Sequence, residues 1–251
     1  MDLLDTHNHT AEWSDGHQSI EKIIERSAAT GVRVGLADHA GLGDYLNSPD
    51  WLLAYADFLG QYPVARGMEM DLGRSFQVPP SVRARFHYVI GSVHGLETGG
   101  ERKSFSHLLH FLHGREKDYD PRREFGDMDD LLHAHLDLLN RELAAQKYDI
   151  LGHCSLLPPL VLGTPEEVFP GWWEDGLVSI LKARDVAVEC SNRWQTPYPR
   201  LMAKAVAAGL RFSAGSDGHE PERSCQLDYP RKILADFSVG PDRIFDVRCL
   251  R

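Results

Sequence analysis

The chain has 251 residues, of which 42% are hydrophobic, and a formal net charge of −10 with histidine counted as neutral. This length suits one large α/β barrel or two small domains, and the apolar fraction supports a sizeable buried core. The acidic balance and the lack of a basic stripe argue against general nucleic-acid binding and against a DNA exonuclease, since phosphate contacts need Lys and Arg. They do not exclude a small anionic substrate, because two or three divalent cations would reverse the sign of the charge locally.

Hydropathy and cysteine spacing indicate the compartment in which the protein is expected. No apolar run approaches the roughly 20 residues that a membrane span needs, so we expect no membrane partner. The first residues lack the basic and long apolar regions of a signal peptide and are expected to form a strand of the fold. Cys154, Cys190, Cys225 and Cys249 lie far apart without a CxxC pair, which favours a reduced, cytoplasmic protein. Cys154 and Cys190 stand at expected strand ends, where we favour small buried hydrophobes over metal ligands.

The first expected strand, at residues 3–4, leads into Asp5-Thr6-His7-Asn8-His9. Two histidines at positions i and i+2 of an extended chain point to the same face, so both rings can reach one metal. Asp15 follows in a Ser-Asp-Gly turn, and His17 is an alternative to it as a ligand.

Helical and extended patterns then alternate along the chain. Ser19 is suited to cap the first expected helix and Gly31 to end it. Helices are expected at residues 19–30, 49–59, 127–146, 172–183, 198–208 and 231–236, with a short helical segment after Pro79-Pro80. Strands are expected at residues 32–37, 64–70, 87–93, 148–152, 186–190 and 211–215, and a proline-rich loop at 158–170.

Residues 95–125 interrupt this alternation with a polar, Arg- and Lys-containing stretch. An excursion of this length from a strand end is usually functional, and we interpret it as a rim or lid segment. Its His107, His110 and His113 are spaced by three, but successive steps of three drift around a helix, so a rim role is favoured over a metal site. His133 and His135 fall inside an expected helix and are likewise left out of the metal site.

Five of the six later strands end in a side chain that metals bind. These ligands are His39, Glu69, His94, His153, and Asp217 with His219. Seven βα units predict a parallel sheet, and ligands at every strand end but one predict closure into a barrel with a metal centre at its mouth. No linker or composition shift divides the chain, so residues 1–251 are expected to form a single barrel domain with an insertion at about 95–125.

The complete set, with His7, His9 and Asp15 added, has six imidazoles and three carboxylates. One catalytic zinc uses about three protein ligands, so nine predict two or three divalent ions, which could be Zn, Mn or Fe. Glu69 or Asp217 would bridge them. The expected reaction is hydrolysis of a phosphate ester by a metal-bridging hydroxide, with Asp217, His219 and Glu69 as catalytic residues.

Two further carboxylates stand beside these histidines. Asp5 precedes His7, and Asp38 precedes His39. They are expected to accept hydrogen bonds from imidazoles and fix their tautomers, the alternative being exposed turn residues.

The quoted motifs resemble those of the PHP (polymerase and histidinol phosphatase) family. The resemblance rests on His7 and His9 in DTHNHT, Asp15 in SDG, His39 in ADH, Glu69 in GMEMD, His94 in IGSVH, His153 in ILGH, and Asp217 with His219 in GSDGH. It implies an α/β fold, a distorted (β/α)7 TIM-like barrel with a trinuclear site. The absence of an attached polymerase or exonuclease module resembles the stand-alone branch that hydrolyses L-histidinol phosphate to histidinol and phosphate in histidine biosynthesis.

One departure concerns the fifth strand, where many members of that family carry an acidic residue two positions after the histidine. This chain has Ser155 there, which would change the support of His153 without removing a ligand.

A phosphate site is expected after the sixth strand. The guanidinium of Arg193 matches phosphate oxygens in pairs, the alternative being a surface arginine paired with Glu189 or Asp175. Arg223, just past GSDGH, is a further candidate, followed by Arg102 and Lys103 on the rim segment.

Alternative functions remain open, since the fold does not determine the substrate. The first is hydrolysis of another small phosphorylated metabolite or nucleotide. A barrel that binds metal without catalysis is disfavoured, because all nine positions carry competent ligands. Histidinol phosphate carries a cationic amine, so its pocket needs an acidic group opposite the phosphate arginine, and Glu97, Glu101 and Glu12 are the candidates. The oligomeric state is left open.

Overall fold

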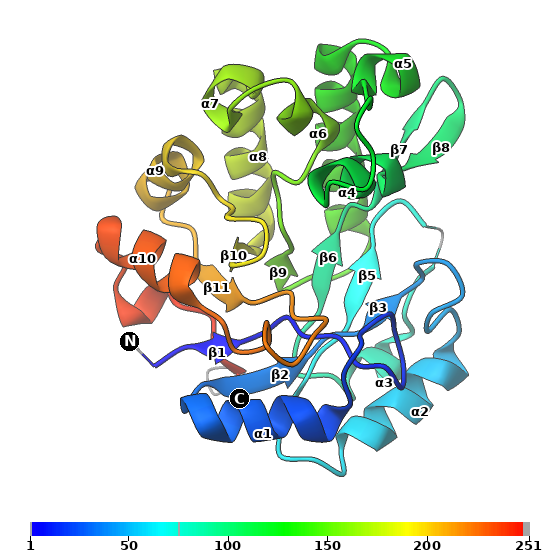
Figure 1. Cartoon of the computed structure of the whole chain (residues 1–251), viewed down its shortest axis with the longest axis vertical. Coiled ribbons are helices and arrows are strands. Elements are labelled where there is room, and N and C mark those ends of the chain that lie inside the picture. Colours follow the sequence, from blue (N-terminus) through cyan, green and yellow to red (C-terminus); the bar gives the residue numbers. More distant parts are fainter. Residues whose placement is uncertain (1, 75, 248–251) are drawn as a thin grey trace.

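The computed structural model describes residues 2–74 and 76–247 (Figure 1). Its centre is a nine-stranded sheet in which all the pairings between strands are parallel. The strands are β1 (Leu4–Asp5), β2 (Arg33–Leu36), β3 (His39–Ala40), β4 (Ala65–Arg66), β5 (Glu69–Asp71), β6 (Ile90–Ser92), β9 (Ile150–Leu151), β10 (Ala187–Ser191) and β11 (Phe212–Gly215). A separate antiparallel hairpin is formed by β7 (Gly95–Thr98) and β8 (Glu101–Ser104).

Two of the expected strands are each interrupted once. Residues 37–38 separate β2 from β3, and residues 67–68 separate β4 from β5. β2 pairs with β4 and β3 pairs with β5, so the two interrupted strands remain neighbours on both sides of the break. The strand order is β3-β5-β6-β9-β10-β11-β1-β2-β4. One end of this order, β3, continues β2, and the other end, β4, continues into β5.

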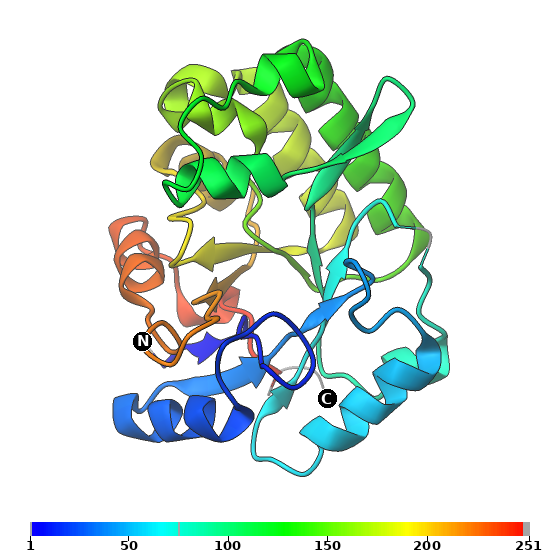
Figure 2. The same ribbon diagram turned by 45° about the vertical axis from the view of Figure 1, so that its right-hand side comes forward.

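Helices surround the strands in both views (Figures 1 and 2). They are α1 (Ile20–Thr30), α2 (Pro49–Leu59), α3 (Pro80–Arg83), α4 (Ser106–Leu112), α5 (Pro121–Phe125), α6 (Met128–Ala145), α7 (Pro165–Val168), α8 (Gly171–Arg184), α9 (Pro199–Ala207) and α10 (Asp228–Asp236), with short 3-10 turns η1 (Pro158–Val161) and η2 (Pro241–Arg243). Gly31 ends α1 in the left-handed conformation, with φ of 70°, as its position predicts. No described helix combines the length and the apolar character needed to cross a bilayer.

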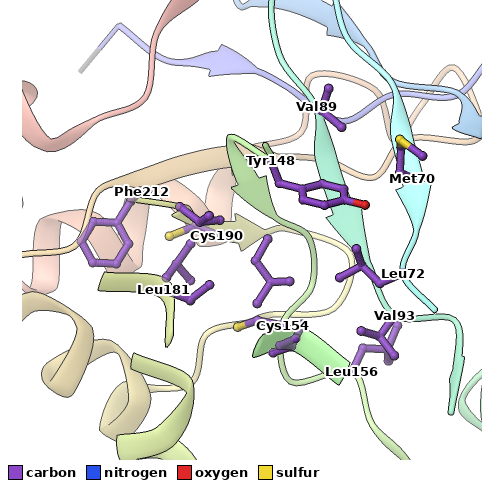
Figure 3. Packing of buried hydrophobic residues seen from close by; sticks show 14 of the residues in the cluster. Met70, Leu72, Val89, Val93, Tyr148, Cys154, Leu156, Leu181, Cys190 and Phe212 are labelled. Atoms are coloured by element: carbon purple, nitrogen blue, oxygen red, sulfur yellow. The ribbon is translucent and has the colours of Figure 1, made fainter. Parts of the chain in front are cut away.

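The hydrophobic core has two parts. A large cluster packs the sheet against the helices, and Figure 3 shows three of its members: Met70 in β5, Leu72 directly after β5 and Val89 directly before β6. A small cluster gathers Ala187 with apolar residues of β1, β4, β6 and β9. Along β10, Ala187 belongs to the small cluster, whereas Val188 and Cys190 belong to the large one. Because side chains alternate along a strand, Glu189 points to the same side as Ala187.

Most predicted elements are confirmed, with differences at their limits. Several strands are shorter than expected, and much of the difference lies at their amino ends, as in β6 and β9. The expected loop at 158–170 contains η1 and α7, and residues 95–125 contain a hairpin and two short helices. Cys154, Cys190 and Cys225 are buried free thiols, as small hydrophobes would be, while Cys249 lies outside the described residues.

Candidate metal centre

Glu69 lies at the centre of the predicted ligands. It begins β5, is fully buried, and its carboxylate faces imidazoles carried by β3 and by the turns that follow β1, β6 and β9. The distances from a ring nitrogen to a Glu69 oxygen are 3.3 Å for His7, 3.6 Å for His9, 2.6 Å for His39, 3.4 Å for His94 and 3.1 Å for His153. The carboxyl ends of parallel strands meet at one edge, which is why residues so far apart in sequence converge.

Asp217 and Asp15 bring in the last predicted ligand, His219. Oδ1 of Asp217 lies 3.3 Å from Nε2 of His9 and 3.4 Å from Nδ1 of His219. Oδ1 of Asp15 lies 3.4 Å from Nε2 of His39 and 3.3 Å from Nε2 of His219. The nine predicted ligands thus form one continuous cluster.

Within the described part of the chain, three groups of these side chains are close enough to hold a metal ion. The groups are His9, Asp15, His39 and His219; His7, His9 and Glu69; and His39, Glu69 and His94, each with ligand atoms within 4.8 Å of one another. The first group contains Asp15 and not the alternative His17. His153 and Asp217 lie outside the three groups and contact them through Glu69 and His9.

Several buried atoms of the cluster have no hydrogen-bond partner. They include Nε2 of His7, both ring nitrogens of His9 and Oε2 of Glu69. Buried polar atoms without partners are costly, and here the atoms are imidazole nitrogens and carboxylate oxygens that face one another. A divalent cation between them would satisfy both, so the residues fit a metal centre with mixed nitrogen and oxygen ligands.

Two groups at the centre of the cluster have pKa values that suit metal binding, Glu69 and His9. Burial alone would raise the pKa of Glu69, but the imidazoles of His7, His39 and His94 hold it well below its usual range. Burial, with the charges of His219 and His39, lowers the pKa of His9 to about 3. Glu69 is therefore ionised and His9 neutral at physiological pH, which are the forms that bind metals.

The predicted roles of Asp5 and Asp38 need correction. Both are fully buried, so they are not exposed turn residues. Asp5 accepts from the backbone amides of Ser216 and Cys225 at 2.8 and 2.9 Å, and Asp38 accepts from the amide and hydroxyl of Thr10 at 2.6 and 2.9 Å. Both carboxylates hold the loops that carry the ligands, and neither contacts an imidazole in these hydrogen bonds.

Two other carboxylates face the histidines instead. Oε1 of Glu189 lies 2.6 Å from Nδ1 of His7, and Oδ1 of Asp71 lies 3.4 Å from Nδ1 of His94. Asp71 also accepts two hydrogen bonds from Arg102, at 2.8 and 2.7 Å. Arg102 is therefore paired with Asp71. Lys103 donates to the backbone oxygen of Glu124, so neither side chain is directed towards a substrate phosphate.

A cavity of about 410 Å³ opens above the ligands. Seven of the predicted ligands line it, together with residues of α4 and the loop after it, residues of the segment after β10, and Glu220. His110, His113 and Arg115 reach the cavity, so part of the 95–125 segment forms its rim. His107 is exposed and pairs with Glu116. His133 stacks on Trp172 and His135 accepts from Trp173, and neither belongs to the three ligand groups.

Arg193 also lines this cavity. Its Nη1 donates to Nδ1 of His219 at 2.7 Å, and its guanidinium lies 4.8 Å from the centre of the Trp194 ring. The alternative of a surface pair is wrong, because Glu189 is buried against His7 and Asp175 pairs with Lys204.

The other expected pocket residues lie elsewhere. Arg223 is largely exposed beside Glu220 and does not line the cavity, although its charge helps to lower the pKa of His113. The acidic candidates Glu97, Glu101 and Glu12 do not line the cavity either, whereas Glu220 does.

Sequence reasoning missed three residues of the site: Trp194, Glu189 and Asp71. Nε1 of Trp194 donates to Oδ2 of Asp217 at 2.5 Å. Asp71 is the last residue of β5, which begins with Glu69, and Trp194 follows Arg193 in the segment after β10. The positions of both residues were therefore a usable signal. Glu189 lies inside an apolar strand, where a lone carboxylate was the only signal.

Comparisons with known proteins bear on the fold. No protein-family model matches the chain, and no curated protein matches it in sequence. The structure of a candidate histidinol phosphatase, hisK from Listeria monocytogenes, has a TM-score of 0.69 and 16% identity, covering 91% of this chain and 99% of that one. Histidinol phosphate phosphatase from Lactococcus lactis, solved with Zn, L-histidinol and phosphate, has a TM-score of 0.62 and 16% identity, covering 95% of each chain. The chain therefore has the α/β fold of these histidinol phosphatase structures over nearly its whole length.

Proposed function

We propose that this chain is a metal-dependent phosphomonoesterase of the PHP type that hydrolyses L-histidinol phosphate to L-histidinol and phosphate. The observation that carries the proposal is the cluster of six imidazoles and three carboxylates around Glu69, at the floor of an open cavity. The similar Lactococcus lactis protein was solved with Zn and both products of this reaction, which supports the substrate.

The proposed architecture is a closed, distorted seven-stranded barrel formed by a single domain. If β2 with β3, and β4 with β5, are each counted as one interrupted strand, the strand order has seven members. The pairings β2–β4 and β3–β5 then join its two ends, which supports closure. Residues 95–125 would serve as a rim or lid of the cavity. The proposed location is the cytoplasm, because the cysteines are dispersed along the chain.

The proposed cofactors are two or three divalent ions, Zn, Mn or Fe, held by His7, His9, Asp15, His39, Glu69, His94, His153, Asp217 and His219. Ions bound there would supply Lewis-acid stabilisation of the phosphoryl group and an activated water molecule. Glu69, which faces five imidazoles, is placed to be shared between ions.

Protein groups around the cavity would bind and orient the phosphate. Arg193 is the proposed phosphate ligand, since its paired donors match phosphate oxygens and its Nε is a buried donor without a partner. Trp194 supports it twice, because its ring lies beside the guanidinium and its Nε1 holds Asp217 in place. Asp217, His219 and Glu69 remain the proposed catalytic residues.

A second candidate is hydrolysis of a phosphorylated metabolite that carries another negative charge. The observation that favours it is the charge at the cavity rim, where Arg115 and Arg193 lie near His110 and His113. Apart from the proposed ligands, Glu220 is the acidic side chain that lines the cavity within the described residues. A cationic amine would have Glu220 as its partner, whereas a second anionic group would have Arg115.

The test is phosphate release by purified protein reloaded with Mn²⁺, Zn²⁺ or Fe²⁺. L-histidinol phosphate is compared with a generic aryl phosphate and with a sugar phosphate that bears a carboxylate. A kcat/KM for histidinol phosphate of roughly 10⁴ M⁻¹s⁻¹ or above, well over the others, supports the proposal. Turnover of the other phosphates alone would retain the metal chemistry and reject histidinol phosphate as substrate.

A further inference from the structure

Glu189 is a buried carboxylate to which the proposed function assigns no role. It lies in the middle of β10, is fully buried, and points to the same side of the strand as Ala187. Its two oxygens have separate partners: Oε1 lies 2.6 Å from Nδ1 of His7, and Oε2 accepts from the backbone amide of His153 at 2.6 Å. An isolated carboxylate is costly to bury, so a position that keeps it needs these two donors.

We infer that Glu189 is a positioning residue for the metal centre, which orients His7 and His153 at once without itself binding a metal. The inference rests on the metal centre of the proposed function and not on its substrate. A carboxylate can only accept, so the contact of 2.6 Å requires the proton of His7 to lie on Nδ1. In the neutral imidazole, which is the form that binds a metal, Nε2 then carries the lone pair, and it is this atom that faces Glu69 at 3.3 Å and Asp217 at 3.9 Å.

The orientation of His7 has a consequence for the cation site. A lone pair on Nε2 facing two carboxylates is unfavourable unless a proton or a metal ion lies between them, and Nε2 is a buried atom without a hydrogen-bond partner. His7 belongs to the candidate ligand group with His9 and Glu69. Glu189 therefore selects the tautomer that binds a metal, and its negative charge increases the basicity of the imidazole.

The second oxygen acts on the backbone of another ligand. His153 has φ of 24°, in the left-handed region that a residue with a side chain rarely adopts. The hydrogen bond from its amide to Glu189 holds this conformation, in which Nε2 of His153 reaches Glu69 at 3.1 Å. One carboxylate thus sets the direction of two ligands on either side of Glu69.

Gly215 on the adjacent strand β11 leaves the space that Glu189 needs. A Cβ at this position would lie 2.1 Å from Oε1 of Glu189 and 2.9 Å from Cβ of His7. Only glycine avoids both collisions, so the sequence at β11 accommodates the carboxylate of β10.

The first test is the replacement Glu189→Gln. An amide has one accepting and one donating end, so it can accept from His7 or from the His153 amide but not from both. We expect Zn²⁺ affinity, measured by competition with a chromogenic chelator, to fall by about 10–100-fold. Glu174→Gln is the matched control, because Glu174 is equally buried but pairs with Tyr198, Arg200 and Lys204 on the helix side. Its Zn²⁺ affinity should equal that of the wild type.

The second test uses the unaltered protein, and so does not depend on how well the variant folds. Two-bond ¹H–¹⁵N NMR of the Zn²⁺-loaded protein, with His7 assigned through His7→Asn, should show the proton of His7 on Nδ1 and none on Nε2. A proton on Nε2, or a Glu189→Gln variant whose Zn²⁺ affinity stays within about twofold of the control, would overturn the inference. If Glu189→Gln loses affinity while the wild type fails to hydrolyse histidinol phosphate, the inference stands and the proposed function fails.

Discussion

The indole nitrogen of Trp194 donates a hydrogen bond to Oδ2 of Asp217, and the same ring lies beside the guanidinium of Arg193. This leaves Oδ1 of Asp217 directed at His9, 3.3 Å away. Trp194 therefore contacts both the proposed phosphate ligand Arg193 and the proposed metal ligand Asp217, so phosphate binding and metal binding share one supporting residue.

Trp194→Phe should separate these two contacts. Phenylalanine keeps a ring beside Arg193 but cannot donate to Asp217. A hydrogen bond to a charged group contributes about 1.5–3 kcal/mol, so we expect kcat/KM to fall by roughly 10–100-fold with KM changed less. Trp172→Phe, at an exposed tryptophan stacked on His133, is the control and should retain full activity. Equal activity of the two variants would remove Trp194 from the site.

Asp217→Asn should abolish metal retention and nearly all turnover. The substitution removes a negative charge that faces His9 and His219, while the surrounding strands keep their packing. Metal content after dialysis and circular dichroism of the metal-free protein are the measurements. Asp175→Asn, at an exposed carboxylate paired with Lys204, serves as the control. Normal turnover by Asp217→Asn would reject the assigned metal centre.

Arg193→Ala should mainly raise KM for a phosphorylated substrate. Loss of paired, charged hydrogen bonds to phosphate predicts an increase of at least about 10-fold. Arg193→Lys should recover only part of this, because an ammonium lacks the fork geometry. Arg85→Ala, at an exposed arginine paired with Asp57, is the control. An unchanged KM in Arg193→Ala would place the phosphate elsewhere.

Removal of metal should lower thermal stability reversibly. The buried imidazole and carboxylate atoms that lack partners would be satisfied only in the loaded protein. A ligand at 100 times its Kd adds about 2.7 kcal/mol, which corresponds to a rise in Tm on the order of 5–10 °C. Differential scanning calorimetry before and after chelation, and again after Zn²⁺ is returned, measures this. A Tm that does not respond to metal would contradict the proposed centre.

His135, which is not a proposed metal ligand, predicts a loss of stability in acid. Burial lowers the pKa of His135 to about 3, and its Nδ1 accepts from Nε1 of Trp173 at 3.2 Å. Below the unfolded pKa of about 6.5 the unfolded chain binds a proton that the folded chain does not, so stability is complete above that pH and falls as pH decreases towards 3. The loss should reach about 2 kcal/mol at pH 5.

The variant His135→Asn keeps an acceptor for Trp173 but cannot titrate. Urea unfolding at pH 7 and pH 5 should therefore show a smaller loss of stability for this variant than for the wild type. His133→Asn, on the exposed face of the same helix, should behave as the wild type does. Identical pH dependence of His135→Asn and wild type would refute the assignment.

The sequence by itself determined the alternating βα organisation and the identity of the nine clustered side chains. Both follow from local patterns: apolar runs of strand length, helical periodicity, and a metal-type ligand at the end of each run, such as His39 or His153. Because parallel strands place their carboxyl ends at one edge, a ligand at each end is enough to predict convergence without knowing the order of the strands. For the same reason Glu69 and Asp217 could be proposed as shared ligands.

Only the tertiary structure decided which groups support the ligands. Asp5 and Asp38 adjoin histidines in sequence but bond backbone amides, whereas Glu189 contacts His7 from 182 residues away. A hydrogen bond depends on which strands are neighbours and which faces their side chains share, and neither is written in the spacing of residues along one strand. The same limit hid the bond from Trp194 to Asp217 and the engagement of Arg102 by Asp71. The local sequence pattern thus determines which ligand side chains stand at the strand ends, and the packing of distant strands determines which groups hydrogen-bond to them.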